Sequence, residues 1–196
     1  MLLAPPGAGK GTQARRLAAR YGITQISSGE LFRENVRSGT LLGRIAAAYL
    51  LRGDLVPDEL ALEMMATPIT EAASRGGFVL DGFPRTVRQA EELEQLCDDA
   101  PAVHLNAVID LAVSRDELRS RLLARARSEG RSDDTAQTID RRLTVFEEET
   151  RLLVAFYSQR GLLLQIDGQR SMDEVFSDIV AAISKSSDMK HHRPSN

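Results

Sequence analysis

Residues 4–12 of this chain read APPGAGKGT, between a short apolar run at 1–3 and a segment with helical periodicity that begins at Lys10. Glycines at positions 7, 9 and 11 let the backbone wrap closely enough for successive N–H groups to face phosphate oxygens, and a helix start adds the positive end of its dipole. A turn that joins a strand to a helix would explain the glycines alone. Only three of the 25 basic residues are lysines, however, and one of them is Lys10. The stretch therefore predicts a phosphate-binding loop.

Outward from this loop, short apolar runs alternate with longer helical patterns, which is typical of a wound α/β domain with a mainly parallel sheet. Five strands are expected, at 1–3, 23–27, 78–81, 105–111 and 162–167. Helices are expected at 10–21, 30–38, 41–52, 58–75, 86–96, 115–127, 135–160 and 171–185. The first strand is unusually short, and Pro68 should kink or restart the fourth helix near Thr67.

Composition narrows the class of protein. The length of 196 residues suits one compact domain, and 42% hydrophobic residues with a net charge of -3 are ordinary values for a globular enzyme. A pI near 5.7 disfavours a nucleic-acid partner, and a mean hydropathy of -0.23 without a long apolar run disfavours a membrane span. The single Cys97 permits neither an internal disulfide nor a cysteine-based metal site. No signal-type segment is evident at the N-terminus, so we expect a cytoplasmic protein.

Three further stretches follow the loop in order. They read QISSGELFRENVRSG at 25–39, GDLVPDEL at 53–60 and FVLDGFPRTVRQAEEL at 78–93. Arginines such as Arg33 and Arg85 can grip a phosphate with two hydrogen bonds, although a lone arginine is more often a solvated surface residue. Asp81 could reach Mg²⁺ through water or could cap the turn after its strand. The amide of Gln89 can pair with adenine through one donor and one acceptor.

Together with the loop, these stretches resemble adenylate kinases and other nucleoside monophosphate kinases, over nearly the whole chain. The resemblance implies a P-loop nucleoside triphosphate hydrolase-like fold with three layers, a five-stranded parallel sheet flanked by helices. Ala4 departs from the family, which normally has glycine at this position. If the position required a positive φ, Ala4 would add roughly 1 kcal/mol of strain and weaken ATP binding.

The resemblance also implies the activity, which is reversible Mg²⁺-dependent transfer of the terminal phosphoryl group of ATP to AMP, giving two ADP, in nucleotide homeostasis. The residues implied in transfer are Lys10, Asp81, Arg85, Arg125, Arg131 and Arg142. Those implied in ATP binding are Gly7, Ala8, Gly9, Lys10, Gly11, Thr12, Arg125 and Arg170. Those implied in AMP binding are Ser28, Arg33, Asp54, Leu55, Val56, Gly82, Phe83, Pro84, Arg85, Gln89, Arg131 and Arg142. Mg²⁺ would come with ATP, with Thr12 and Asp81 reaching it through water rather than as direct ligands.

Residues 119–142, RSRLLARARSEGRSDDTAQTIDRR, resemble the short lid of these kinases, because only five residues separate Arg125 from Arg131. A longer inserted lid and its zinc site are therefore not expected. The expected organisation is a single domain over 1–184, with a monophosphate-binding segment at 27–56 and a lid at 124–134. Residues 185–196 are polar and without periodicity, and are expected to be a disordered tail.

Three alternatives remain open at this point. A kinase for UMP or CMP would share the loop and the lid, although an asparagine would be expected in place of Gln89. A non-catalytic ATP-binding protein would keep the loop without transfer, and Ala4 favours that alternative. A nucleic-acid-binding module is the weakest of the three. The expected partners are the small nucleotides ATP, AMP and ADP, with no nucleic acid and no membrane, and the chain is expected to be a monomer.

Overall fold

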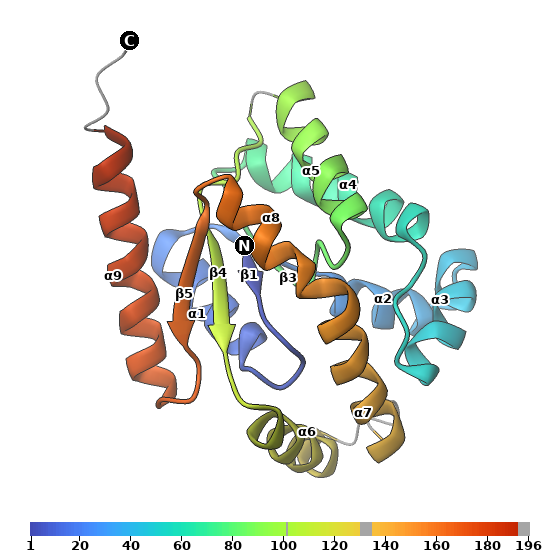
Figure 1. The fold of residues 1–196 in the computed structure, drawn as a ribbon. Coiled ribbons are helices and arrows are strands. Elements are labelled where there is room, and N and C mark those ends of the chain that lie inside the picture. Colours follow the sequence, from blue (N-terminus) through green and yellow to red (C-terminus); the bar gives the residue numbers. More distant parts are fainter. Residues whose placement is uncertain (101, 130–134, 192–196) are drawn as a thin grey trace.

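The computed structural model describes residues 1–100, 102–129 and 135–191. Its strands are β1 Leu2–Leu3, β2 Thr24–Ser27, β3 Phe78–Asp81, β4 Val108–Ala112 and β5 Leu163–Asp167. All pairings are parallel, and the order across the sheet is β2-β3-β1-β4-β5 (Figure 1). The predicted α/β class with a five-stranded parallel sheet is confirmed.

The shortest strand lies at the centre of the sheet. Leu2 pairs with Asp81 of β3 and with Ile109 of β4, and Leu3 pairs with Asp110. Both leucines are 2% exposed. Two residues are enough here because β3 and β4 pair with the β1 backbone on both sides, and both leucine side chains are almost fully buried.

Helices cover both faces of the sheet and its carboxyl end. They are α1 Lys10–Tyr21, α2 Ser28–Arg37, α3 Leu41–Arg52, α4 Asp58–Ser74, α5 Val87–Asp99, α6 Arg115–Glu129, α7 Ala136–Val145, α8 Leu152–Gln159 and α9 Met172–His191, with a π-helical turn, η1 Phe146–Thr150. α1 and α9 pack on one face, whereas α4, α5 and α8 pack on the other. In Figure 1 the arrowheads of β4 and β5 point toward α6, and α2 and α3 form a separate hairpin at the side. The result is the expected three-layer arrangement.

The predicted helix over 135–160 is interrupted, and this part of the prediction is wrong. Before η1, Ile139 and Leu143 pack in the cluster that α1 and α6 share; after it, Leu153 and Tyr157 pack against β1, β4 and α5. A π turn inserts one residue and rotates the apolar stripe that follows it. The apolar spacing across 139–156 reads as one stripe, so the sequence does not reveal the turn.

Smaller differences concern the boundaries of single helices and strands. Of the kink or restart predicted near Thr67, the restart is wrong, since α4 runs unbroken through Pro68. Burial of Met65 and Ile69 on either side stabilises the helix against the one hydrogen bond that the proline removes. β4 begins three residues later than predicted and ends one later, at Ala112. α9 continues to His191, whereas its end was predicted at 185, where the expected tail begins. Residues 192–196 lie outside the described part.

Candidate functional site

A cavity of ≈ 550 Å³ lies at the carboxyl ends of the parallel strands. Its walls come from the loop after β1, the start of α2, residues 50–56, the turn after β3, and one side of α6, α7 and η1. Crevices outside the carboxyl ends of strands are where open α/β sheets bind ligands. The fold therefore brings the predicted motifs together at one site.

The loop after β1 packs so closely against α6 that only glycine fits at position 7. Gly7 has a φ of +86°, and a Cβ there would lie 2.9 Å from Leu122 Cγ and 3.0 Å from the carbonyl oxygen of Leu118. Gly9 has a φ of +89° and is the N-terminal cap of α1. The backbone can therefore curve around the start of α1, as the phosphate-loop prediction requires.

Lys10 is half-buried against this loop. Its Nζ donates to the carbonyl oxygens of Ala4 at 2.6 Å and Pro5 at 2.9 Å. Burial lowers the pKa of Lys10 to about 8; the nearby Asp81 raises it, and the cationic Arg85 and Arg125 lower it further. The ammonium group thus lies near one carboxylate and two cations, an environment in which polyanionic phosphates would stabilise its charge.

Ala4 does not carry the strain considered above. Among the described residues, only glycines have a positive φ, so the alanine methyl group needs no unusual backbone conformation. Ala4 is 4% exposed and packs in the core. The reason for suspecting a weakened ATP site therefore falls away.

At the end of β3, Asp81 approaches the loop. A Cβ on Gly11 would lie 3.3 Å from Asp81 Oδ2, and both Thr12 and Asp81 line the cavity. The described residues contain no group of three or more His, Cys, Asp or Glu side chains that could by themselves hold a metal ion. One carboxylate and one hydroxyl are hard oxygen donors of the kind that accompany Mg²⁺ when it is mainly bound by water and phosphate.

The turn after β3 fixes Arg85. Its Nε donates to the carbonyl oxygen of Gly82 at 2.7 Å, and Ser28 Oγ donates to the same oxygen at 2.6 Å. Gly82 has a φ of +79°, and a Cβ there would lie 2.9 Å from Arg85 Nη2. Burial lowers the pKa of Arg85, Asp81 opposes this, and the cationic Arg142 and Arg33 add to the lowering. The site thus concentrates positive charge around one point.

Gln89 lies four residues after Arg85, in the first turn of α5, and is 2% exposed. Its Oε1 accepts the backbone N–H of Arg85 at 2.8 Å, and its Nε2 donates to Asp58 Oδ1 at 2.7 Å. Gln89 lines the cavity, whereas Asp58 is not among the lining residues. The sequence pointed to Gln89 as a base-reading residue but did not identify its partner Asp58.

Residues at the end of α3 connect the predicted monophosphate-binding segment to α7. Arg142 Nη2 donates to the carbonyl oxygen of Leu50 at 3.3 Å. Asp54 accepts from Arg141 at 2.8 Å and from Arg52 at 2.9 Å, and these two arginines, Arg141 first, lower its pKa. The carboxylate of Asp54 is therefore engaged with protein arginines at the cavity wall.

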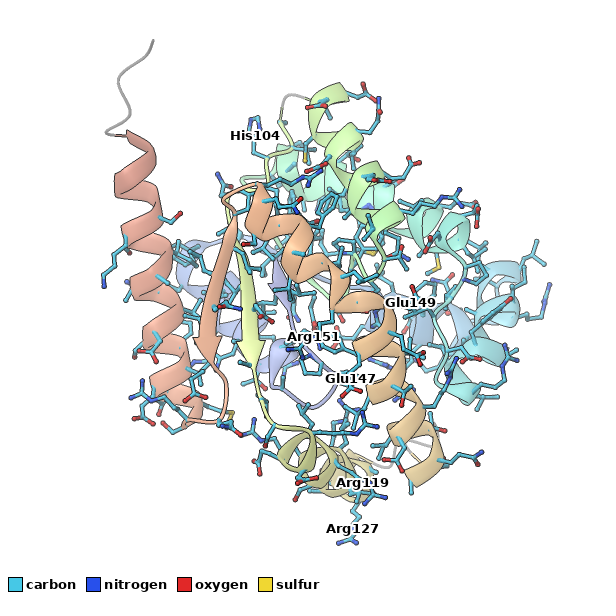
Figure 2. The ribbon with its side chains drawn as sticks, in the orientation of Figure 1. His104, Arg119, Arg127, Glu147, Glu149 and Arg151 are labelled. Carbon is cyan, nitrogen blue, oxygen red and sulfur yellow. The ribbon has the colours of Figure 1, made fainter. Side chains whose placement is uncertain are left out.

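The arginines of α6 point in different directions. Arg121 and Arg125, four residues apart, line the cavity, whereas Arg127 points away from the sheet (Figure 2). Arg121 Nε donates to Glu117 at 2.6 Å, and its Nη1 donates to the carbonyl oxygen of Gly168 at 3.2 Å. Arg121 is not among the residues that the resemblance implies in transfer, ATP binding or AMP binding, although its spacing from Arg125 places it on the same face of α6. Arg131 lies outside the described residues.

Most of the predicted site residues therefore meet in the cavity. Those that line it are Gly7, Gly9, Lys10, Gly11, Thr12, Ser28, Arg33, Asp54, Leu55, Val56, Asp81, Gly82, Phe83, Pro84, Arg85, Gln89, Arg125 and Arg142. Ala8 packs in the core instead, and Arg170 pairs with Glu174 and Asp178 on α9. Phe146 and Thr150 of η1 also line the cavity. They could not be selected from the sequence, because the π turn that presents them was not predicted.

None of the helices in the described part of the chain combines the length and the apolar character needed to cross a membrane.

Comparison with known proteins gives consistent matches. The model of the adenylate kinase family matches residues 2–162. The adenylate kinase of Thermobifida fusca is 47% identical over 183 residues, covering 93% of this chain and 96% of that protein. The adenylate kinase of Kocuria rhizophila is 45% identical over 185 residues, covering 94% of this chain and 98% of its own. That of Thermus thermophilus is 44% identical over 183 residues, covering 93% and 95%.

Proposed function

The chain belongs to the adenylate kinase family, and on that premise we propose that it transfers the terminal phosphoryl group of ATP to AMP in the cavity described above, giving two ADP. The observation that carries the proposal is the convergence of Lys10, Arg85, Arg125 and Arg142 on one cavity that also contains Gln89. Two polyanions can be held together only where such a concentration of cations offsets their mutual repulsion.

In phosphoryl transfer the protein mainly positions the two nucleotides and stabilises the developing charge, and it forms no covalent bond to them. In this proposal the loop N–H groups and Lys10 hold the phosphates of ATP, while Arg33 and Arg85 hold the phosphate of AMP. Arg125 and Arg142 lie between the ATP and AMP phosphates and stabilise charge on the phosphoryl group during transfer. Arg131 is proposed to assist them. No protein general base is needed.

Mg²⁺ is proposed to enter with ATP. The oxygen donors Thr12 and Asp81 fit such an ion, held mainly by phosphate and water, and the described residues form no separate metal cage. When bound, the ion neutralises charge on the terminal phosphates of ATP. Thr12 and Asp81 would orient the water molecules around it. Zinc has no part in the proposal.

Gln89 supports AMP as the acceptor, because a carboxamide offers one donor and one acceptor to the edge of adenine. The backbone of residues 54–56 and of the turn 82–84 would enclose the AMP site. The segments 27–56 and 124–134 are proposed to close over both nucleotides and exclude water as a competing acceptor. We also propose that the chain acts as a cytoplasmic monomer, which light scattering at assay concentration would test for oligomeric state.

An acceptor panel tests the proposal. ADP formation from ATP and Mg²⁺ would be followed with AMP, CMP, UMP and GMP in turn, with Lys10→Met as the control variant. We expect rapid turnover with AMP that the control loses. Preference for UMP or CMP would identify a pyrimidine monophosphate kinase instead. ATP binding without transfer to any acceptor would identify a binding protein.

A further inference from the structure

The amide of Gln89 is held at both ends by groups that allow one orientation only. The backbone N–H of Arg85, which can only donate, meets Oε1 at 2.8 Å. The carboxylate of Asp58, which can only accept when ionised, meets Nε2 at 2.7 Å. Amide orientation has to be assigned from such partners, and here both partners agree.

Asp58 is itself held in place. It is the first residue of α4, where the helix dipole favours a negative charge. Thr86 Oγ1 donates to the same Asp58 oxygen at 3.1 Å, and the Thr86 hydroxyl also accepts the backbone N–H of Gln89 at 3.1 Å as the cap of α5. A hydroxyl has one proton, so this proton must point to Asp58. The order of donors and acceptors around the amide is therefore fixed throughout.

This order determines what Gln89 can offer a ligand. An amide group has two N–H donors and two oxygen lone pairs. Asp58 and Arg85 use one of each, so one donor and one acceptor remain for the cavity. The free edge matches a 6-aminopurine, whose N1 accepts and whose amino group donates. A 6-oxopurine has the opposite arrangement, because its O6 accepts and its N1–H donates, and it would need the inverted amide.

We propose that Asp58 is a positioning residue that sets the selectivity of the acceptor site for 6-aminopurine over 6-oxopurine nucleoside monophosphates, by holding Gln89 in one amide orientation. The inference rests on the proposed function, since it assumes that the base of AMP lies at Gln89. Asp58 acts through Gln89, as it does not line the cavity itself. Inverting the amide would place Nε2 against the N–H of Arg85 and Oε1 against the carboxylate of Asp58.

The test compares AMP with inosine monophosphate, which differs from AMP at the 6-position and in the N1 proton. In Asp58→Asn the new side chain can present either an oxygen or an NH₂ group, so an inverted Gln89 gains a partner. We expect the ratio of kcat/KM for AMP to that for inosine monophosphate to fall about tenfold or more, the worth of one mismatched hydrogen bond. The change should lie mainly in the KM of the acceptor, with the KM of ATP unchanged.

Glu59→Gln is the matched control. It removes the same charge from the same helical turn, but Glu59 pairs with Arg88 at 2.7 Å and not with Gln89. We expect the control to keep the selectivity of the wild-type protein. An unchanged ratio in Asp58→Asn, or an equal fall in both variants, would overturn the proposal.

A second measurement uses the wild-type protein, in case Asp58→Asn does not fold. NMR of the Gln89 side chain should show that AMP shifts one Nε2 proton strongly and leaves the other, donated to Asp58, nearly unchanged. Equal shifts of both protons, or of neither, would overturn the orientation role. Wild-type protein that binds AMP in this way but transfers nothing to it would count against the proposed function and leave the role of Asp58 standing.

Discussion

At the scale of single residues, the charge of Lys10 depends on its burial. Its pKa is lowered to about 8, so the free protein loses this positive charge as the pH rises through that value. Bound phosphates would raise the pKa again, so binding takes up a proton above pH 8. We therefore predict that the Kd for ATP is nearly constant below pH 8 and rises above it. Calorimetric titrations between pH 7 and 9.5 would measure this.

Lys10→Met provides the comparison for that titration. Its affinity for ATP should be weak throughout and nearly independent of pH over the same range. A wild-type Kd that does not change with pH, or an equal rise in Lys10→Met, would contradict the assignment of the titrating group to Lys10.

Gly82 gives a second prediction at this scale. In Gly82→Ala the new methyl group would lie 2.9 Å from Arg85 Nη2 and 3.0 Å from Ser28 Oγ. Arg85 must move, and a displacement of about 1 Å at a phosphate clamp can cost on the order of 100-fold in rate. Steady-state kinetics should show a fall of about that size in kcat/KM for AMP.

The matched control is Gly22→Ala, at the end of α1. Gly22 has a similar φ of +64°, but a Cβ there would meet nothing within 4 Å. This variant should lose about 1 kcal/mol of stability from backbone strain and keep its activity. Equal kinetic loss in both variants would mean that strain, and not the position of Arg85, causes the effect.

At the scale of elements, the hairpin of α2 and α3 depends on a close contact at Gly43. A Cβ on Gly43 would lie 2.1 Å from the carbonyl oxygen of Asn35 in α2. Gly43→Ala should force the two helices apart and destabilise the protein by about 3 kcal/mol, at the upper end of usual overpacking costs. α2 carries Ser28 and Arg33, so the KM for AMP should rise much more than the KM for ATP. Equal increases in both would contradict the assignment of this hairpin to AMP.

The π turn η1 shows what an element-level prediction from sequence can miss. Spacings of three, four or seven between Ile139 and Phe156 predict one continuous helix, and both halves are indeed helical. The inserted residue is visible only in the packing, because the two halves face different clusters around the sheet. Tertiary contacts on each side select the turn, and they are absent from a local pattern.

At the scale of the whole molecule, the cavity concentrates like charges contributed by separate elements. The loop, the turn after β3, α6 and α7 supply Lys10, Arg85, Arg125 and Arg142. Arg85 and Arg125 lower the pKa of Lys10, and Arg142 lowers that of Arg85. Binding of two polyanions would remove this repulsion and draw the walls inward. We predict that the radius of gyration measured by small-angle scattering falls when ATP and AMP are both present, and falls less with AMP alone. An unchanged value would contradict closure.

The sequence was sufficient for the architecture and for most of the cavity, because the loop and the three later motifs are local patterns whose residues lie near the carboxyl ends of strands. It was less informative about residues that act through others. Asp58 is 31 residues from Gln89, and only the packing of α4 against α5 brings their side chains to 2.7 Å. For Arg170 the resemblance implies a contact with ATP, and in the structure its guanidinium pairs with carboxylates of α9.

Phosphoryl transfer in this cavity is tested most directly by starting from ADP alone. With Mg²⁺ and no other nucleotide, ³¹P NMR would follow the spectrum over time in the presence of the wild-type protein. A kinase that joins ATP and AMP in this cavity must also run in reverse, so ATP and AMP should appear together in equal amounts and no inorganic phosphate should form. ADP that persists unchanged, or that yields inorganic phosphate, would contradict the account.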